Sequence, residues 1–216
     1  MEEKKILYKA GQGEYIEKKS RFIADLFPVQ SEEEAMEYLA NIKKKHYSAR
    51  HHCYAYVIEK DGKQETRCSD DGEPSNTAGR PMLEILQGEN ITGVMAIVTR
   101  YFGGTLLGTG GLVRSYSNAL KEAIKDACFL EKKQGRYFYI ETDYNGLGKI
   151  QYISNQLGLH EQSVNYGEKV HMVLLVEENL VDKAQKEIVE KTSATAQIEK
   201  SDIITYGLGQ DEIVIY

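Results

Sequence analysis

Residues 94–114 read VMAIVTRYFGGTLLGTGGLVR, and this stretch decides the fold. Its first part, up to Phe102, is a nearly continuous apolar run, which is typical of a buried strand in the middle of a sheet. From Leu112 to Ala127 apolar residues recur at helical spacing, which predicts an amphipathic helix. The glycine-rich interval 103–111 between them is expected to be a loop. The stretch therefore predicts a strand, a loop and a helix within a mixed α and β domain.

The residues before this stretch predict further strands and two helices. Apolar, β-branched and aromatic residues predict strands at 15–16, 21–27, 52–58 and 63–68, the last two joined by a hairpin turn at 61–62. A capping box begins at Ser31, whose hydroxyl is expected to accept from the amide of Glu34 while the Glu34 side chain reaches back to the N-cap. It predicts a helix over 32–46. Thr77 is expected to cap a short helix that ends near Gly88.

The residues after the stretch predict a second domain. The polar segment LEKKQG, at 130–135, is expected to be a linker. Beyond it, strands are predicted at 137–142, 159–165, 169–176 and 195–206, helices at 144–157 and 180–191, and a further strand at 211–216. The order strand, helix, strand, strand, helix, strand is the split βαβ or ferredoxin-like pattern. We therefore expect an α+β protein of two domains, 1–131 and 132–216.

Composition excludes several classes of protein. Hydrophobic residues make up 41% of the chain and charged residues 28%, as in an ordinary globular protein. No apolar run approaches the ~20 residues of a membrane helix, and the first residues lack the apolar core of a signal peptide. Cys53, Cys68 and Cys128 are too widely spaced for a disulfide framework, which fits a reducing compartment. We therefore expect a cytoplasmic protein without a membrane partner.

The net charge of −6 is distributed unevenly. Residues 1–132 contain 19 Lys/Arg and 20 Asp/Glu, whereas residues 133–216 contain 8 and 13. This excludes a general nucleic-acid coat but leaves room for a local basic surface in the first domain. Basic residues stand beside aromatic ones at 43–47, 50–54 and 100–102, a pattern found where proteins hold nucleic-acid backbones and bases. Scattered surface charges are the alternative interpretation.

The glycine-rich interval is the first candidate binding site. Five glycines between a strand and a helix let backbone amides approach an anion, and the helix N-terminus adds partial positive charge. It is not a Walker A loop, because Thr109 stands where lysine is required, and it is not a dinucleotide fingerprint. A tight corner that needs glycine only for its backbone is the alternative. The candidate phosphate-binding residues are Arg67, Arg100, Gly103, Gly104, Gly108, Gly110, Gly111 and Arg114.

The acidic turn Asp70, Asp71 and Glu73 is the second candidate. Its carboxylates suit Mg²⁺, and a pair of aspartates suits acid–base chemistry. Turn chemistry alone also explains them, because aspartate side chains cap local amides and the helix that follows. We favour capping and expect no cofactor, with Mg²⁺ at Asp70 and Asp71 as the alternative. Zinc is not expected, because no Cys-x-x-Cys pair is present, and no residue is identified as a catalytic nucleophile.

Four segments resemble the signature blocks of the IMPACT/YigZ family, in the family's order. They are SDDGEPS at 69–75, TAGRP at 77–81, RYFGG at 100–104 and LGTGGLVRSY at 107–116. The resemblance covers about residues 15–127, and residues 137–216 resemble the C-terminal domain of bacterial members. It implies an N-terminal ribosomal-protein-like domain similar to domain IV of elongation factor G, followed by a ferredoxin-like domain. Eukaryotic relatives regulate translation.

The residues and the resemblance together favour a translation-linked regulatory factor. It is expected to bind RNA or the ribosome through the glycine-rich loop and the flanking arginines, with the acidic turn beside them. Two alternatives stay open: a Mg²⁺-dependent enzyme acting on nucleotides or phosphates, and a docking module that binds a protein partner through its C-terminal domain. Because the loop has no lysine and no base motif is present, catalysis is not expected.

Overall fold

The computed structural model describes residues 4–60, 63–209 and 212–216, which form an α+β protein. The chain divides into two compact units, Met1–Glu131 and Lys132–Tyr216, called unit 1 and unit 2 below. The predicted turn at 61–62 and the first residue of the predicted strand 211–216 lie outside the described residues. Within the described part, no helix has both the length and the apolar character needed to cross a bilayer.

Unit 1 is built on a five-stranded antiparallel sheet with the order β2-β3-β7-β4-β5. The strands are β2 (Gly11–Glu17), β3 (Ser20–Pro28), β4 (His51–Lys60), β5 (Lys63–Ser69) and β7 (Val94–Tyr101). The prediction that the apolar run forms a central strand is confirmed, because β7 lies between β3 and β4 and seven of its eight residues are buried.

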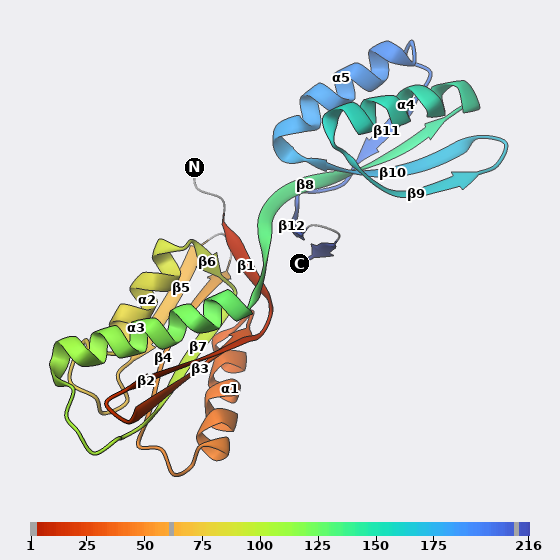
Figure 1. The fold of residues 1–216 in the computed structure, drawn as a ribbon. Helices are drawn as coiled ribbons and strands as arrows, with labels where there is room; N and C mark the ends of the chain where they lie inside the picture. Colours follow the sequence, from red (N-terminus) through yellow and green to blue (C-terminus); the bar gives the residue numbers. More distant parts are fainter. Residues whose placement is uncertain (1–3, 61–62, 210–211) are drawn as a thin grey trace. The chain divides into compact units, whose positions relative to one another are not determined.

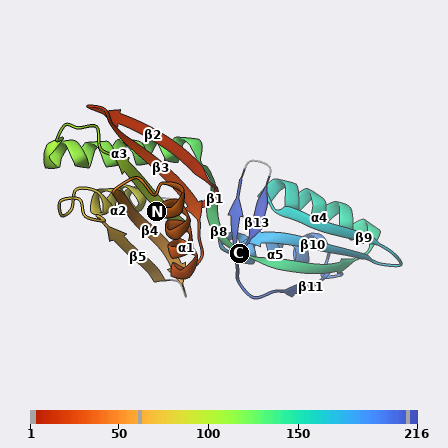
Figure 2. The same ribbon diagram turned by 90° about the horizontal axis from the view of Figure 1, so that it is seen from below.

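Helices cover both faces of this sheet (Figures 1 and 2). Helix α1 (Glu32–Lys45) packs on one face through Ala35, Leu39 and Ile42. Helices α2 (Gly79–Gly88) and α3 (Gly108–Asp126) pack on the other face, where Tyr116 is among the largest fully buried side chains. The sheet thus has an apolar core on each face, because successive side chains of a strand point to opposite faces. Half of the capping box is confirmed: the Ser31 side chain accepts from the amide of Glu34. The Glu34 carboxylate accepts from the amide of Gln30, one residue before the N-cap that it was expected to reach.

Helix α3 begins at Gly108, four residues before the predicted start at Leu112. The prediction that 103–111 is all loop is therefore wrong, and Gly108, Gly110 and Gly111 lie in the first turn of the helix. Glycine has a low helix propensity, which hides this turn in the sequence. Tertiary packing of the apolar stripe that begins at Leu112 supports it instead.

Two short strands of unit 1 were not predicted. Strand β1 (Lys5–Lys9) pairs in parallel with β6 (Ile91–Thr92) and antiparallel with residues 128–131 of β8 (Cys128–Thr142). Their pairing partners lie far away along the chain, so a local pattern carries little signal for them. The predicted linker 130–135 contains the division between the two units, and β8 continues through it as a strand.

Unit 2 has the predicted order of elements. Strand β8 is followed by α4 (Tyr144–Leu157), β9 (His160–Tyr166), β10 (Val170–Glu177), the short 3-10 helix η1 (Glu178–Leu180), α5 (Val181–Lys191) and β11 (Gln197–Lys200). The strands form an antiparallel sheet in the order β11-β8-β10-β9. Helices α4 and α5 lie on one face of it (Figure 1). The predicted strand 195–206 is split, because β12 (Ile204–Leu208) starts separately and pairs with β13 (Ile213–Ile215).

Candidate functional site

The segments that carry the candidate residues meet at one end of unit 1. We call this the loop end and define it as residues 17–20, 43–52, 69–78 and 100–114. Contacts join its parts: the acidic turn reaches the start of β4 and the end of β7, and Gly103 lies directly on the β2–β3 turn. Residues far apart in the sequence are thereby brought to one surface.

Asp70 organises the acidic turn as a helix cap. Its Oδ1 accepts from the amides of Ala78 (3.0 Å) and Gly79 (2.8 Å), and its Oδ2 accepts from Asn76 (2.7 Å). The prediction that Thr77 caps α2 is wrong, because its hydroxyl donates to a carbonyl inside the turn. Asp70 performs that role from eight positions upstream of Ala78, and capping by a turn aspartate is confirmed.

Asp71 ties the turn to β4 and α1. Its backbone has a φ of 41°, and its carboxylate accepts from the His52 amide (2.7 Å) and from Lys43 Nζ (3.1 Å). Burial raises the pKa of Asp71, but these hydrogen bonds outweigh burial, so the pKa lies below its ordinary value. Its carbonyl oxygen is 2.9 Å from His51 Nδ1. Asp71 therefore acts as an ionised clamp for the turn.

Glu73 and Arg100 form a buried ion pair. Arg100 Nη1 donates to Glu73 Oε1 at 2.6 Å, and the two side chains are only 6% and 3% exposed. Tyr116 donates its hydroxyl to the same oxygen at 2.8 Å, and the Cys53 thiol donates to Tyr116 at 3.3 Å. Burial raises the pKa values of Tyr116 and Cys53 far above their ordinary range, so both stay protonated.

The ion pair corrects the expectation that Arg100 binds phosphate. Alternation along β7 points its side chain inward, where the guanidinium lies 5.4 Å from the ring centre of Phe22 and 5.6 Å from that of Phe102. Arg67 is also removed from the loop end: it lies on β5 and pairs with Glu32, in the first turn of α1. Arg114 is exposed, and no partner for it is found among the described residues.

The glycines of the interval have two different roles. A side chain at Gly103 would collide with the backbone of Lys19, 2.1 Å from its carbonyl carbon, while the Gly103 amide donates to Ser20 Oγ at 3.0 Å. Gly104 and Gly108 have φ of +86° and +71°, which favours glycine. The tight-corner interpretation thus explains these three glycines. Gly110 and Gly111 lie in the first turn of α3, whose leading amides have no partner within the helix.

The loop end combines exposed cations with exposed apolar side chains. Tyr47, Phe102 and Leu106 are 85%, 53% and 84% exposed. The exposed cations are Lys18, Lys19, Lys43, Lys44, Lys45, Arg50 and Arg114. Reasoning from the sequence missed Lys18 and Lys19, since only the packing of Gly103 on the β2–β3 turn brings them here.

The carboxylates of the loop end are already engaged. Asp70 accepts three backbone amides, Asp71 accepts one amide and a lysine, and Glu73 lies in the buried ion pair. In the described part of the chain, no group of three or more His, Cys, Asp or Glu side chains is placed to hold a metal ion. The geometry therefore favours the capping interpretation of the turn over the magnesium one.

Comparisons with known proteins match both units. Residues 18–124 match the Impact N-terminal domain, and residues 140–195 match a domain of unknown function, DUF1949. The chain is 39% identical to IMPACT family member YvyE of Bacillus subtilis over 195 residues, 90% of this chain and 89% of that one. It is 38% identical to an IMPACT family member of Haemophilus influenzae, covering 86% and 91%. A crystal structure of a hypothetical protein, 29% identical, superposes with a TM-score of 0.58 and covers 98% and 100%.

Proposed function

This chain belongs to the IMPACT family, and on that premise we propose that it is a translation-linked regulatory factor that contacts RNA, free or on the ribosome, through the loop end of unit 1. Such a role places the protein in the cytoplasm.

We also propose that unit 1 is similar to domain IV of elongation factor G and that unit 2 is ferredoxin-like. The antiparallel order β11-β8-β10-β9, joined by α4 and α5, supports the second assignment.

The gathering of exposed cations beside exposed aromatic rings is the observation that carries the RNA proposal. Lysine and arginine side chains pair with phosphates without reading sequence, and aromatic rings stack with unpaired bases. Tyr47 and Phe102 are both more than half exposed and flank Lys43–Lys45 and the loop. Apolar side chains gathered on one exposed surface are typical of interaction sites, which supports a ligand at the loop end.

The structure also changes which residues the proposal uses. Arg100 shapes the loop end from inside through Glu73, whereas Arg114 and the lysines face the ligand. The enzyme alternative lacks a comparable observation, because the aspartates that would bind Mg²⁺ already accept N–H groups.

Binding of a labelled single-stranded RNA, and of purified ribosomes, tests the proposal in a salt series. Arg114→Gln should weaken binding and lower the salt slope by about one. Tyr47→Ala should weaken binding by about 1–3 kcal/mol if the ring stacks on a base. Lys125→Gln, at the other end of α3, and Tyr152→Ala, an exposed tyrosine of α4, are the matched controls. If Arg114→Gln and Tyr47→Ala bind like these controls, or if wild-type protein does not bind, the proposal is wrong.

A further inference from the structure

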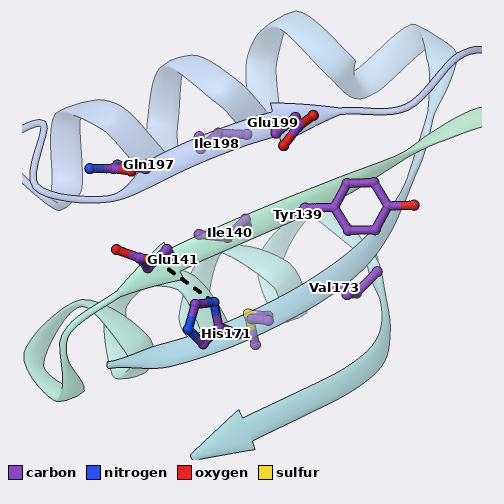
Figure 3. Close-up of a pocket in the computed structure, with 9 residues that line it drawn as sticks. Tyr139, Ile140, Glu141, His171, Val173, Gln197, Ile198 and Glu199 are labelled. Atoms are coloured by element: carbon purple, nitrogen blue, oxygen red, sulfur yellow. Dashed lines mark ion pairs between the residues drawn. The ribbon is translucent and has the colours of Figure 1, made fainter. Parts of the chain in front are cut away.

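The sheet of unit 2 has one covered and one open face. Helices α4 and α5 lie on one side, and Figure 3 shows the strands from the other, with side chains of β8, β10 and β11 standing on the open face. The strand register sets these side chains in two rows. One row is Gln197, Glu141 and His171, and the next is Glu199, Tyr139 and Val173.

The open face is hollowed and carries an exposed aromatic ring. These residues line an open hollow of about 400 Å³. Tyr139 lies on β8, the middle strand of the three, with 46% of its surface exposed, and Val173 lies beside it on β10. An exposed aromatic ring beside polar groups is a feature of protein–protein contacts, where tyrosine is enriched.

The charged groups of this face are mainly acidic. Glu199 is exposed and directly opposite Tyr139 across the β8–β11 pair, and no ion pair involves it among the described residues. Glu141 is paired with Lys169 and lies 4.0 Å from His171 Nδ1. The wider unit has the same sign, since residues 133–216 contain 8 Lys/Arg and 13 Asp/Glu. A partner with positive charge is therefore attracted and a polyanion is repelled.

We propose that the open face of unit 2 is a docking site for a cationic polypeptide segment of a partner protein. An arginine or lysine of the segment lies over the Tyr139 ring with its charge toward Glu199, and apolar neighbours of that residue contact Val173. Cation–π contact and ion pairing act on the same partner side chain in this arrangement, which makes the site selective for basic peptides. No residue of the loop end contributes to this docking site, so the site does not depend on RNA binding by unit 1.

Single-stranded RNA is the competing occupant, because tyrosines on an open sheet face also stack with bases. The negative charge of the open face argues against RNA as its occupant. An RNA backbone on this face would place phosphates beside the unpaired Glu199 carboxylate, whereas a basic peptide neutralises that carboxylate. Each occupant thus predicts a different response to removal of the Glu199 charge: weaker binding of a basic peptide, but stronger binding of RNA.

Amide chemical-shift mapping on the full ¹⁵N-labelled chain tests the proposal with three probes. They are a peptide alternating arginine with valine, the same peptide with glutamate in place of arginine, and a single-stranded oligouridylate. We expect saturable shifts around Tyr139, Val173 and Glu199 with the arginine peptide alone. Tyr139→Ala should weaken its binding about three- to thirtyfold, and Glu199→Gln about two- to fivefold.

Matched controls separate this site from general charge attraction. Asp182→Asn on α5 removes the same charge from the covered side, and Tyr152→Ala removes an exposed tyrosine from α4. Both should bind the arginine peptide like wild type. The proposal is overturned if shifts map elsewhere, if the site variants match these controls, if the oligouridylate takes this face, or if no probe saturates. Glu199→Gln changes only an exposed charge, so it keeps the test valid if Tyr139→Ala unfolds.

Discussion

At the scale of single residues, the buried ion pair of Arg100 and Glu73 joins the acidic turn to the central strand. Two charges out of water are stable only when paired and hydrogen-bonded, and here Tyr116 adds a second donor to the Glu73 carboxylate. Asp70 and Asp71 act at the same scale by fixing the turn through backbone amides. The shape of the loop end thus rests on a few polar contacts, and Lys43 is the exposed cation that also takes part in them, through Asp71.

We predict that Arg100→Met destabilises the protein by about 3–5 kcal/mol, because it leaves the Glu73 carboxylate buried without its cation. Adding Glu73→Gln should recover part of this loss, since the glutamine amide is neutral and keeps an acceptor for Tyr116. Urea unfolding of both single variants and the double variant measures the coupling free energy between Arg100 and Glu73. Arg114→Gln, at an exposed arginine, should change stability by less than about 0.5 kcal/mol. Additive losses in the double variant would contradict a buried pair.

At the scale of elements, α3 lies unusually close to β2. A side chain at Gly13 would come within 2.3 Å of the Ala123 amide nitrogen, and one at Gly11 within 2.5 Å of the Ala123 carbonyl oxygen. Only glycine allows β2 and α3 to come this close. This contact fixes the position of α3, whose first turn belongs to the loop end. The glycines of β2 therefore position the candidate site from a distance, although they take no part in it.

Gly13→Ala should destabilise unit 1 by about 1–3 kcal/mol, because the added carbon overlaps backbone atoms that cannot move without shifting α3. Gly148→Ala is the matched comparison. Gly148 lies inside α4, with open space where the new carbon would be, so the same substitution should stabilise unit 2 by about 0.4–1 kcal/mol. Thermal unfolding of both variants measures whether each substitution lowers or raises the stability of its unit. A neutral Gly13→Ala would show that α3 is free to move away from β2.

At the scale of the whole molecule, the two units have separate apolar cores and different electrostatic character. Among the described residues, each cluster of buried apolar side chains lies entirely within one unit. The exposed cations of the loop end belong to unit 1, and the acidic open face belongs to unit 2. The two proposals therefore assign to one chain two surfaces of opposite charge preference, one for RNA and one for a basic segment.

We predict that the cores lose stability independently. Leu174→Ala should destabilise unit 2 by about 2–5 kcal/mol and speed amide exchange in α4, α5 and β10. Leu26→Ala should destabilise unit 1 by a similar amount and speed amide exchange in β3, β7 and α3. Hydrogen exchange followed peptide by peptide distinguishes the two patterns. Faster exchange in β7 after Leu174→Ala would show that the cores unfold together.

The sequence by itself determined the elements whose signals are local. Apolar runs, helical periodicity and capping residues act over a few neighbouring positions, so they located β7, the whole of α4 and the capped start of α1, and they identified the turn aspartates as caps. Only the tertiary structure decided which charges are free. Arg100 is buried because Glu73, 27 residues away, meets it inside the fold, and Lys19 joins the loop end because Gly103 packs against it. Exposure depends on what packs against a side chain, and those neighbours come from distant parts of the chain.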